Sequence, residues 1–193
     1  MGASRETTYR EALNEALDLV LGKYPESYII GEGVDDAPAI FGSTRGLLQK
    51  YGESRVIDSP LSEAAVTGVV LGSAAAGARP IMVHQRMDFL GVAMDQMLNH
   101  ISKWRYIFGG ASAAPLVVRC IIGKGWGQGA QHSQALHAMF AHMPGLRVYM
   151  PAVPADAKGL LLHACMSGDP VLFVEHRTLY DSRGPVPRGW KPA

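Results

Sequence analysis

Six short apolar segments, separated by stretches with helical spacing, constrain the fold of this chain more than any other feature. Residues 116–122 are apolar almost throughout, which is typical of a strand buried on both faces. The predicted strands are residues 27–30, 56–58, 81–84, 116–122, 146–150 and 171–175. Strands that alternate with helices pair in parallel through right-handed crossovers. The sequence therefore predicts an α/β fold with a mainly parallel six-stranded sheet and helices on both faces.

Helices are predicted between these strands from apolar spacing and from end signals. They are residues 9–23, 46–51, 61–76, 89–108, 133–142 and 155–167. Ser133 is expected to cap the helix that it opens. Residues 1–180 would then form one domain. Residues 181–193 contain three prolines and two glycines, and we expect an unpacked linker or tail there.

Composition excludes several classes of partner. The chain has 18 basic and 17 acidic residues and a formal net charge of +1, so neither nucleic acid nor an anionic membrane is expected. Two cysteines, Cys120 and Cys165, favour a reducing compartment over a disulfide framework. Residues 1–10 lack the apolar core of a signal peptide, and residues 64–78 are too few to span a bilayer. We therefore expect a cytoplasmic protein.

The carboxyl ends of the strands are where a parallel sheet binds ligands. The segments at that edge are Glu32 and residues 58–63, 84–89, 123–132 and 175–176. Glu63 is the only acid between Ser59 and Met87, and it lies in the first turn of a helix of small apolar residues. One interpretation is an exposed acid that stabilises the helix dipole. The other is a carboxyl group in a helix buried on most sides, which could hold or share a proton.

Residues 123–129 have glycine at every second position, and His132 follows them closely. This pattern matches neither a phosphate-binding loop nor a dinucleotide-binding turn. His132 is interpreted either as a structural histidine or as a site residue beside the glycine-rich loop. His132, His137 and His142 lie about 140° apart on a helix, so they cannot share a metal, and no zinc site is expected. The Gly-x-Ser-x-Gly motif of hydrolases is also absent.

Taken together, a set of short motifs resembles the beta chain of the thiamine-diphosphate-dependent dehydrogenase component of 2-oxo acid dehydrogenase complexes. The motifs include Gly31-Glu32, Arg55 to Glu63 (RVIDSPLSE), Gly77-Ala78-Arg79-Pro80, Met87-Asp88-Phe89, Gln131-His132-Ser133-Gln134, Pro144-Gly145-Leu146, Asp156 to Leu160 (DAKGL) and Glu175-His176. The similarity extends from Thr7 to Tyr180 in the family's order and spacing.

This resemblance implies the thiamine-diphosphate-binding fold and, within it, the domain that binds the aminopyrimidine ring. Glu63 falls on the family's glutamate, which hydrogen-bonds the ring nitrogen N1′ and so activates the cofactor. Phe89 falls where the family packs an aromatic side chain against the pyrimidine. Gln85 matches a glutamine of branched-chain-type members, and His132 matches a histidine that faces the substrate channel. The implied catalytic residues are therefore Glu63 and His132, and the implied cofactor-binding residues are Glu63, Gln85 and Phe89.

The resemblance also implies cations and a partner. Leu116, Ala164, Ser167 and Asp169 match a corner that binds potassium through backbone carbonyls. The Gly-Asp-Gly motif that holds Mg²⁺ and the diphosphate is absent, so an alpha-like subunit should supply them. Family beta chains continue past a Pro-rich linker into a second domain, and from the resemblance we expect this sequence to end within that linker. Self-association is expected through the apolar stripe of residues 89–108.

Two departures from the family concern the substrate. Arg86 stands where related chains carry an apolar or small residue, and it either selects a substrate with an additional anionic group or pairs with Asp88. Lys124, Trp126 and Gln128 also fill the glycine-rich loop differently from the family. Transfer of the acyl group to a lipoyl arm therefore remains open.

Three functions remain. The first is a catalytic subunit of a split thiamine-diphosphate enzyme that decarboxylates a 2-oxo acid and transfers its acyl group. The second is a split transketolase-like or acyloin-forming subunit, which makes or breaks a carbon–carbon bond. The third is a non-catalytic scaffolding module, against which Glu63 argues because it is the only acid in its stretch.

Overall fold

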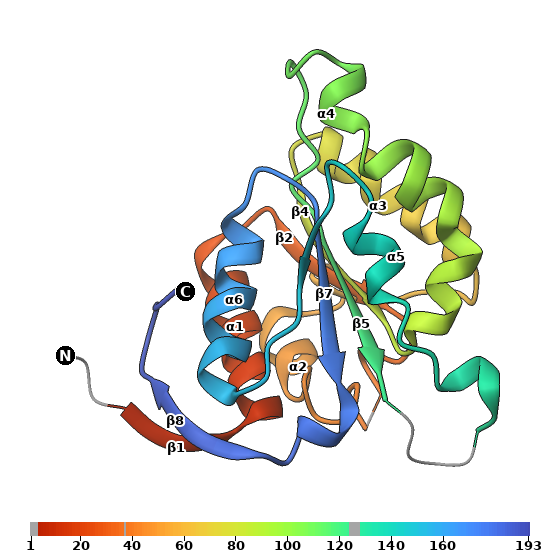
Figure 1. The fold of residues 1–193 in the computed structure, drawn as a ribbon. Helices are drawn as coiled ribbons and strands as arrows, with labels where there is room; N and C mark the ends of the chain where they lie inside the picture. Colours follow the sequence, from red (N-terminus) through yellow and green to blue (C-terminus); the bar gives the residue numbers. More distant parts are fainter. Residues whose placement is uncertain (1–3, 37, 124–127) are drawn as a thin grey trace.

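The computed structural model describes residues 4–36, 38–123 and 128–193. Within these residues a six-stranded sheet has the order β3-β2-β4-β5-β7-β6, and every neighbouring pair is parallel. Figure 1 shows helices α1 and α6 side by side on one face of the sheet and α3 and α5 on the other. The prediction of a parallel six-stranded sheet with helices on both faces is confirmed.

The sheet strands are β2 (Ser27–Gly31), β3 (Val56–Asp58), β4 (Arg79–His84), β5 (Val117–Ile122), β6 (Arg147–Tyr149) and β7 (Val171–His176). The α-helices are α1 (Tyr9–Lys23), α2 (Leu47–Tyr51), α3 (Glu63–Ala75), α4 (Trp104–Ile107), α5 (His137–Ala141) and α6 (Pro154–Met166). Short 3₁₀ helices are η1 (Met87–Ala93), η3 (Ala130–His132) and η4 (Arg177–Leu179), and η2 (Gln96–Ile101) is a π-helix. Strands β1 (Ser4–Thr8) and β8 (Arg183–Pro187) form a separate antiparallel pair.

Local sequence determines where the first helix begins. Thr8 accepts a hydrogen bond from the Glu11 backbone at 3.3 Å, and the Glu11 carboxylate accepts one from the Thr8 backbone at 2.8 Å. This capping box satisfies amide groups that have no partner inside the helix. Helix α1 then buries Leu13, Leu17 and Val20 against the sheet. The observed bounds of α1 are those that the sequence predicts.

The predicted continuous helix over residues 89–108 is wrong. The segment is divided into η1, η2 and α4. In η2 the chain is wound more loosely, since the Ser102 amide donates to the Met97 carbonyl, five residues back, at 3.2 Å. The Ser102 hydroxyl also donates to the Leu98 carbonyl at 2.7 Å, a contact that bends helices. The spacing of apolar residues in the sequence indicates which side of this segment faces the core. It does not indicate the Ser102 hydrogen bonds, which compete with those of a regular helix.

The predicted helix over residues 133–142 is shorter than expected, and Ser133 does not cap it. The Ser133 hydroxyl instead donates to the Gly129 carbonyl at 3.0 Å, at the end of η3. The backbone amide of Gln134 donates a hydrogen bond to the Asp88 carboxylate at 3.1 Å. Helix α5 therefore begins only at His137.

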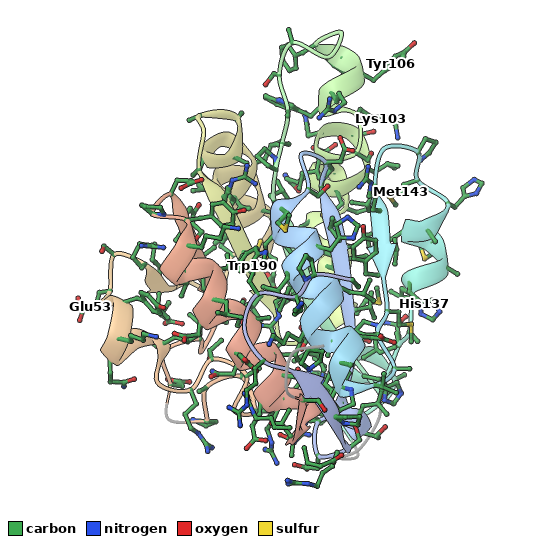
Figure 2. All side chains as sticks on the ribbon, turned by 90° about the vertical axis from the view of Figure 1, so that its left-hand side faces the viewer. Glu53, Lys103, Tyr106, His137, Met143 and Trp190 are labelled. Atoms are coloured by element: carbon green, nitrogen blue, oxygen red, sulfur yellow. The ribbon has the colours of Figure 1, made fainter. Side chains whose placement is uncertain are left out.

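The expectation that residues 181–193 do not pack is also wrong, although a linker role for them stays a prediction. Strand β8 pairs with β1 in the register Arg5↔Val186, and the Val186 side chain is fully buried. Prolines are tolerated because β8 lies at the edge of a two-stranded pair, where a missing amide costs little. Figure 2 shows Trp190 on the side of the molecule formed by α1 and α6, and the Lys23 ammonium lies 3.9 Å from its ring centroid.

Among the described residues, no helix is both long enough and apolar enough to cross a membrane.

Candidate functional site

A cavity of about 330 Å³ opens at the carboxyl ends of the central strands. It is lined by Glu32, Phe41, Glu63, His84, Gln85, Arg86, Phe89, Gln128 and His132. The structure thus brings Glu63, Gln85, Phe89 and His132 around one space, although they come from different elements. Their roles remain predictions.

Two carboxylates form one wall of this cavity. Glu32 follows β2, and Glu63 is the first residue of α3. Burial, then the negative charges of Glu63 and Asp58, raise the pKa of Glu32 above its ordinary value. The half-buried Glu63 carboxylate has no hydrogen-bond or ion-pair partner among the described residues. A carboxylate with no protein partner is available to a ligand.

Helix α3 is not buried on most sides, contrary to expectation. It buries Val66, Val70 and Leu71 on one side only. On the other side Val69 is 63% exposed, and Leu61, just before the helix, is 80% exposed. The small residues of α3 therefore leave an apolar face uncovered beside Glu63.

Two histidines line the cavity, and one nitrogen of each is buried with no hydrogen-bond partner among the described residues. His84 is the last residue of β4 and is 5% exposed, and burial lowers its pKa to about 4. Its imidazole is therefore neutral at pH 7. The His132 ring meets the Phe89 ring edge-on, with centroids 5.1 Å apart.

Gln85 and Arg86 join neighbouring segments of the site. The Gln85 amide donates to the Glu32 carbonyl at 2.8 Å. Arg86 is 6% exposed and donates to the Gly123 carbonyl at 2.7 Å and to the Gln128 side chain at 3.0 Å. Arg86 thus ties the end of β4 to the segment after β5. Of the loop residues that depart from the family, Lys124 and Trp126 lie outside the described residues.

Sequence reasoning did not single out Phe41, and it placed His84 only within a strand-end segment. His84 carried a positional signal because it ends a predicted strand. Phe41 carried none: it lies in a loop where Ala39, Ile40 and Phe41 all have positive φ, between 45° and 56°. Such angles are rare for residues with side chains and are not encoded by local composition.

The residues predicted to bind potassium lie at the opposite ends of β5 and β7 from the cavity. Asp169 pairs with Arg105 and with Arg147, each at 2.8 Å. The Leu116 carbonyl accepts from the Val171 amide at 3.0 Å, and the Ala164 carbonyl accepts from the Ser167 amide at 3.1 Å. Potassium binding there stays a prediction. Across the described residues, no group of three or more His, Cys, Asp or Glu side chains could hold a metal ion.

A larger cavity of about 890 Å³ lies at this same end and is bordered by Trp104, Tyr106 and Pro144. Figure 2 shows Lys103 and Tyr106 at this end of the molecule. The cavity contains a single carboxylate, Asp169, which is already paired with two arginines. The acid–base groups are instead gathered in the smaller cavity, which is therefore the candidate active site.

The fold and this site define a class. The family described as "Transketolase, pyrimidine binding domain" matches residues 5–183, and the chain belongs to that family.

Curated relatives are beta subunits of oxidoreductases. The beta subunit of acetoin:2,6-dichlorophenolindophenol oxidoreductase from Cupriavidus necator is 41% identical over 196 residues, covering 96% of this chain and 58% of the relative. The pyruvate dehydrogenase E1 component subunit beta-2 of Oryza sativa subsp. japonica is 40% identical, covering 95% and 49%. The 2-oxoisovalerate dehydrogenase subunit beta of Bacillus subtilis is 40% identical, covering 93% and 55%. The chain spans about half the length of these relatives.

One solved structure, "Split gene transketolase, inactive beta4 tetramer", matches with a TM-score of 0.70 and 20% sequence identity. The match covers 91% of this chain and 52% of that one. At this identity the likeness concerns the fold alone.

Proposed function

We propose that this chain is the pyrimidine-binding, beta-type subunit of a split thiamine-diphosphate-dependent enzyme that acts on a 2-oxo acid or an acyloin. The observation that carries the proposal is the unpartnered Glu63 carboxylate, which shares a cavity with Phe89 at the carboxyl ends of the strands. The membership of the pyrimidine-binding family and the similarity to beta subunits of acetoin, pyruvate and 2-oxoisovalerate enzymes support it.

The residues of the cavity fit an aminopyrimidine ring. Glu63 offers a carboxylate to a ring nitrogen, and Phe89 offers an aromatic surface to the ring. Glu32 lies near Glu63, and its raised pKa means that its carboxyl group holds a proton more readily than an ordinary glutamate does. When bound, the cofactor would supply an electron sink for the carbanion that forms at the substrate's carbonyl carbon.

The protein's own residues then have separate roles. Glu63 shares a proton with the ring nitrogen, which requires a cavity sheltered from water. The Gln85 side-chain amide donates a hydrogen bond to the Glu32 carbonyl and so positions the loop that follows β4. His132 meets Phe89 edge-on and faces the same cavity, where it orients the substrate.

An alpha-like partner would complete the site. We propose that it holds Mg²⁺ and the diphosphate and covers the exposed apolar face of α3, which includes Val69 and is adjacent to Glu63. Exposed apolar patches beside a site favour an interface. The relatives are themselves named as beta subunits, which supports a heteromer. Tyr106, Ile107 and Phe108 add exposed apolar area through which the chain could associate with itself.

The test is Glu63→Gln in the chain assembled with its alpha-like partner, cofactor and magnesium. The amide cannot share a proton as the carboxylate does, so exchange of the cofactor's thiazolium proton with deuterium should slow by about 100-fold or more. Glu53→Gln is the control, because Glu53 is exposed and does not line the cavity. Figure 2 shows Glu53 at the edge of the molecule. Wild-type exchange in Glu63→Gln would reject the catalytic role and favour a scaffolding module.

A further inference from the structure

Arg86 is a charged residue of the cavity to which the proposed function gives no role. It is buried and lies two residues beyond the end of β4. Its Nη1 atom donates to the Gly123 carbonyl at 2.7 Å, and its Nη2 atom donates to the Gln128 side-chain oxygen at 3.0 Å. A planar guanidinium that holds two acceptors fixes their direction as well as their distance. Arg86 therefore fixes Gly123 and Gln128 relative to each other and to the end of β4.

The residues that follow Arg86 contact the same part of the chain at two further points. The Asp88 carboxylate accepts a hydrogen bond from the Gln134 backbone amide at 3.1 Å. The Phe89 ring meets the His132 ring at an interplanar angle of 79°. Contacts from one short segment thus hold the chain both before and after this histidine.

The chain between Gln128 and His132 is short and bonded to itself. The Gly129 carbonyl accepts a hydrogen bond from the His132 amide at 3.3 Å and another from the Ser133 hydroxyl at 3.0 Å. Gln128 is exposed, so packing restrains it little and its hydrogen bond with Arg86 matters more. A displacement of Gln128 would therefore be passed on to the His132 ring.

We propose that Arg86 is a positioning residue that, through Gln128, holds the His132 imidazole in place against the Phe89 ring. This role differs from selection of an anionic substrate, because the guanidinium is buried and bound to acceptors of the protein itself. The expected effect on turnover rests on the proposed function, in which His132 acts in the site. The positioning itself is a property of the chain and can be measured without a substrate.

The first test observes His132 by NMR in the purified full chain. A neighbouring aromatic ring displaces proton resonances, so the imidazole protons of His132 should differ from their values in the unfolded chain. Gln128→Met keeps the side-chain length but removes the acceptor, and it should move these resonances towards the unfolded values, as should Arg86→Gln. Gln128→Glu still accepts from Arg86 and should keep them close to wild type. Arg188→Gln is the control, because Arg188 is exposed and does not line the cavity.

Unchanged His132 resonances in Gln128→Met would overturn the inference, and so would equal displacements in Gln128→Met and Gln128→Glu. Because Gln128 is exposed, its variants should fold even if Arg86→Gln does not.

The second test measures turnover of pyruvate, 2-oxoisovalerate and acetoin by the assembled enzyme. A displacement of about 1 Å in a site can cost about 100-fold in rate, so Gln128→Met should lower kcat/KM by about 10- to 100-fold. If the pair acts through His132, the same change should cost less than about 2-fold in a chain that already carries His132→Ala. The full loss in both backgrounds would contradict the inference. A wild-type assembly that turns over none of the three substrates would instead reject the proposed function, and the NMR test would then decide the positioning role alone.

Discussion

The Arg119 guanidinium and the Glu175 carboxylate form an ion pair that is fully buried, with Nε to Oε1 at 2.5 Å and Nη2 to Oε2 at 2.9 Å. The Tyr180 hydroxyl donates to the same carboxylate at 2.5 Å, and Arg119 also donates to Ser43 at 3.0 Å. Residue 119 is in β5 and residue 175 is in the neighbouring strand β7, so the pair joins these two strands to the segments that follow β7 and precede α2. Buried charges of this kind are stable only when they are paired.

We therefore expect Arg119→Met to destabilise the fold by about 3–5 kcal/mol, since it leaves the Glu175 charge buried and unpaired. Urea unfolding monitored by circular dichroism measures the loss. Adding Glu175→Gln to the same chain removes the unpaired carboxylate charge and should recover part of the lost stability. A single substitution that costs less than about 1 kcal/mol would show that the pair is not needed.

A second prediction concerns pH. The folded-state pKa of His84 is about 4 and its ordinary value is 6.5, so the unfolded chain binds more protons between these values. The contribution of His84 is therefore complete above about pH 6.5 and is lost as the pH falls towards 4, by about 3 kcal/mol in total. The measurement is the free energy of unfolding of wild type against His84→Gln from pH 7.5 to 4. The difference between the two chains should change across this window, and a constant difference would contradict the prediction.

Much of the fold could be predicted because burial leaves a direct trace in sequence. The six strands of the sheet are short apolar runs, and Glu63 is conspicuous as an acid without neighbouring acids. The division of residues 89–108 could not be predicted, since it depends on hydrogen bonds of Ser102 that compete with the regular helix. Pairing of β8 with β1 joins residues more than 170 positions apart and is invisible to local composition.

The candidate site was predictable to the extent that it lies at strand ends. His84 and Glu32 follow from topology, because parallel strands bring their carboxyl ends to one edge. Phe41 reaches the cavity through three consecutive residues of positive φ, a conformation fixed by tertiary contacts and not by local preference. The lack of a partner for the His84 imidazole is likewise a property of the packed structure.

A third prediction concerns a close approach of two backbone segments. Gly145 has φ +90°, and a Cβ atom there would lie 1.9 Å from the Ser102 carbonyl oxygen. Gly145→Ala should therefore destabilise the chain more than the backbone strain of a positive φ does by itself, because the added Cβ atom also collides with the Ser102 carbonyl. Gly77→Ala is the matched control, because its φ is +102° and nothing lies within 4 Å of the added atom. We expect the control to cost about 1–2 kcal/mol and Gly145→Ala clearly more, as compared by thermal unfolding. Similar losses in the two variants would contradict the predicted collision.

Cofactor affinity should depend on the partner. The chain by itself offers the cavity around Glu63 and Phe89, but under the proposed function the diphosphate and its Mg²⁺ are held elsewhere. Those charged contacts should supply most of the binding free energy. Calorimetry of the purified chain with magnesium and thiamine diphosphate should detect weak binding or none, and adding the alpha-like subunit should restore it. Micromolar affinity in the chain alone would contradict this.

The last prediction tests the surface that the partner is proposed to cover. Val69 is 63% exposed on α3, a few residues after Glu63, so Val69→Asp should leave the fold of the chain unchanged. In the complex, however, the new carboxylate would be buried without a partner, and association should weaken by at least about 10-fold. Val153→Asp is the control, since Val153 is 48% exposed at the start of α6 on the opposite face of the sheet. Light scattering across a concentration series, with and without the alpha-like subunit, measures both effects. If Val69→Asp assembled as tightly as Val153→Asp, the partner would have to bind a different face of the chain.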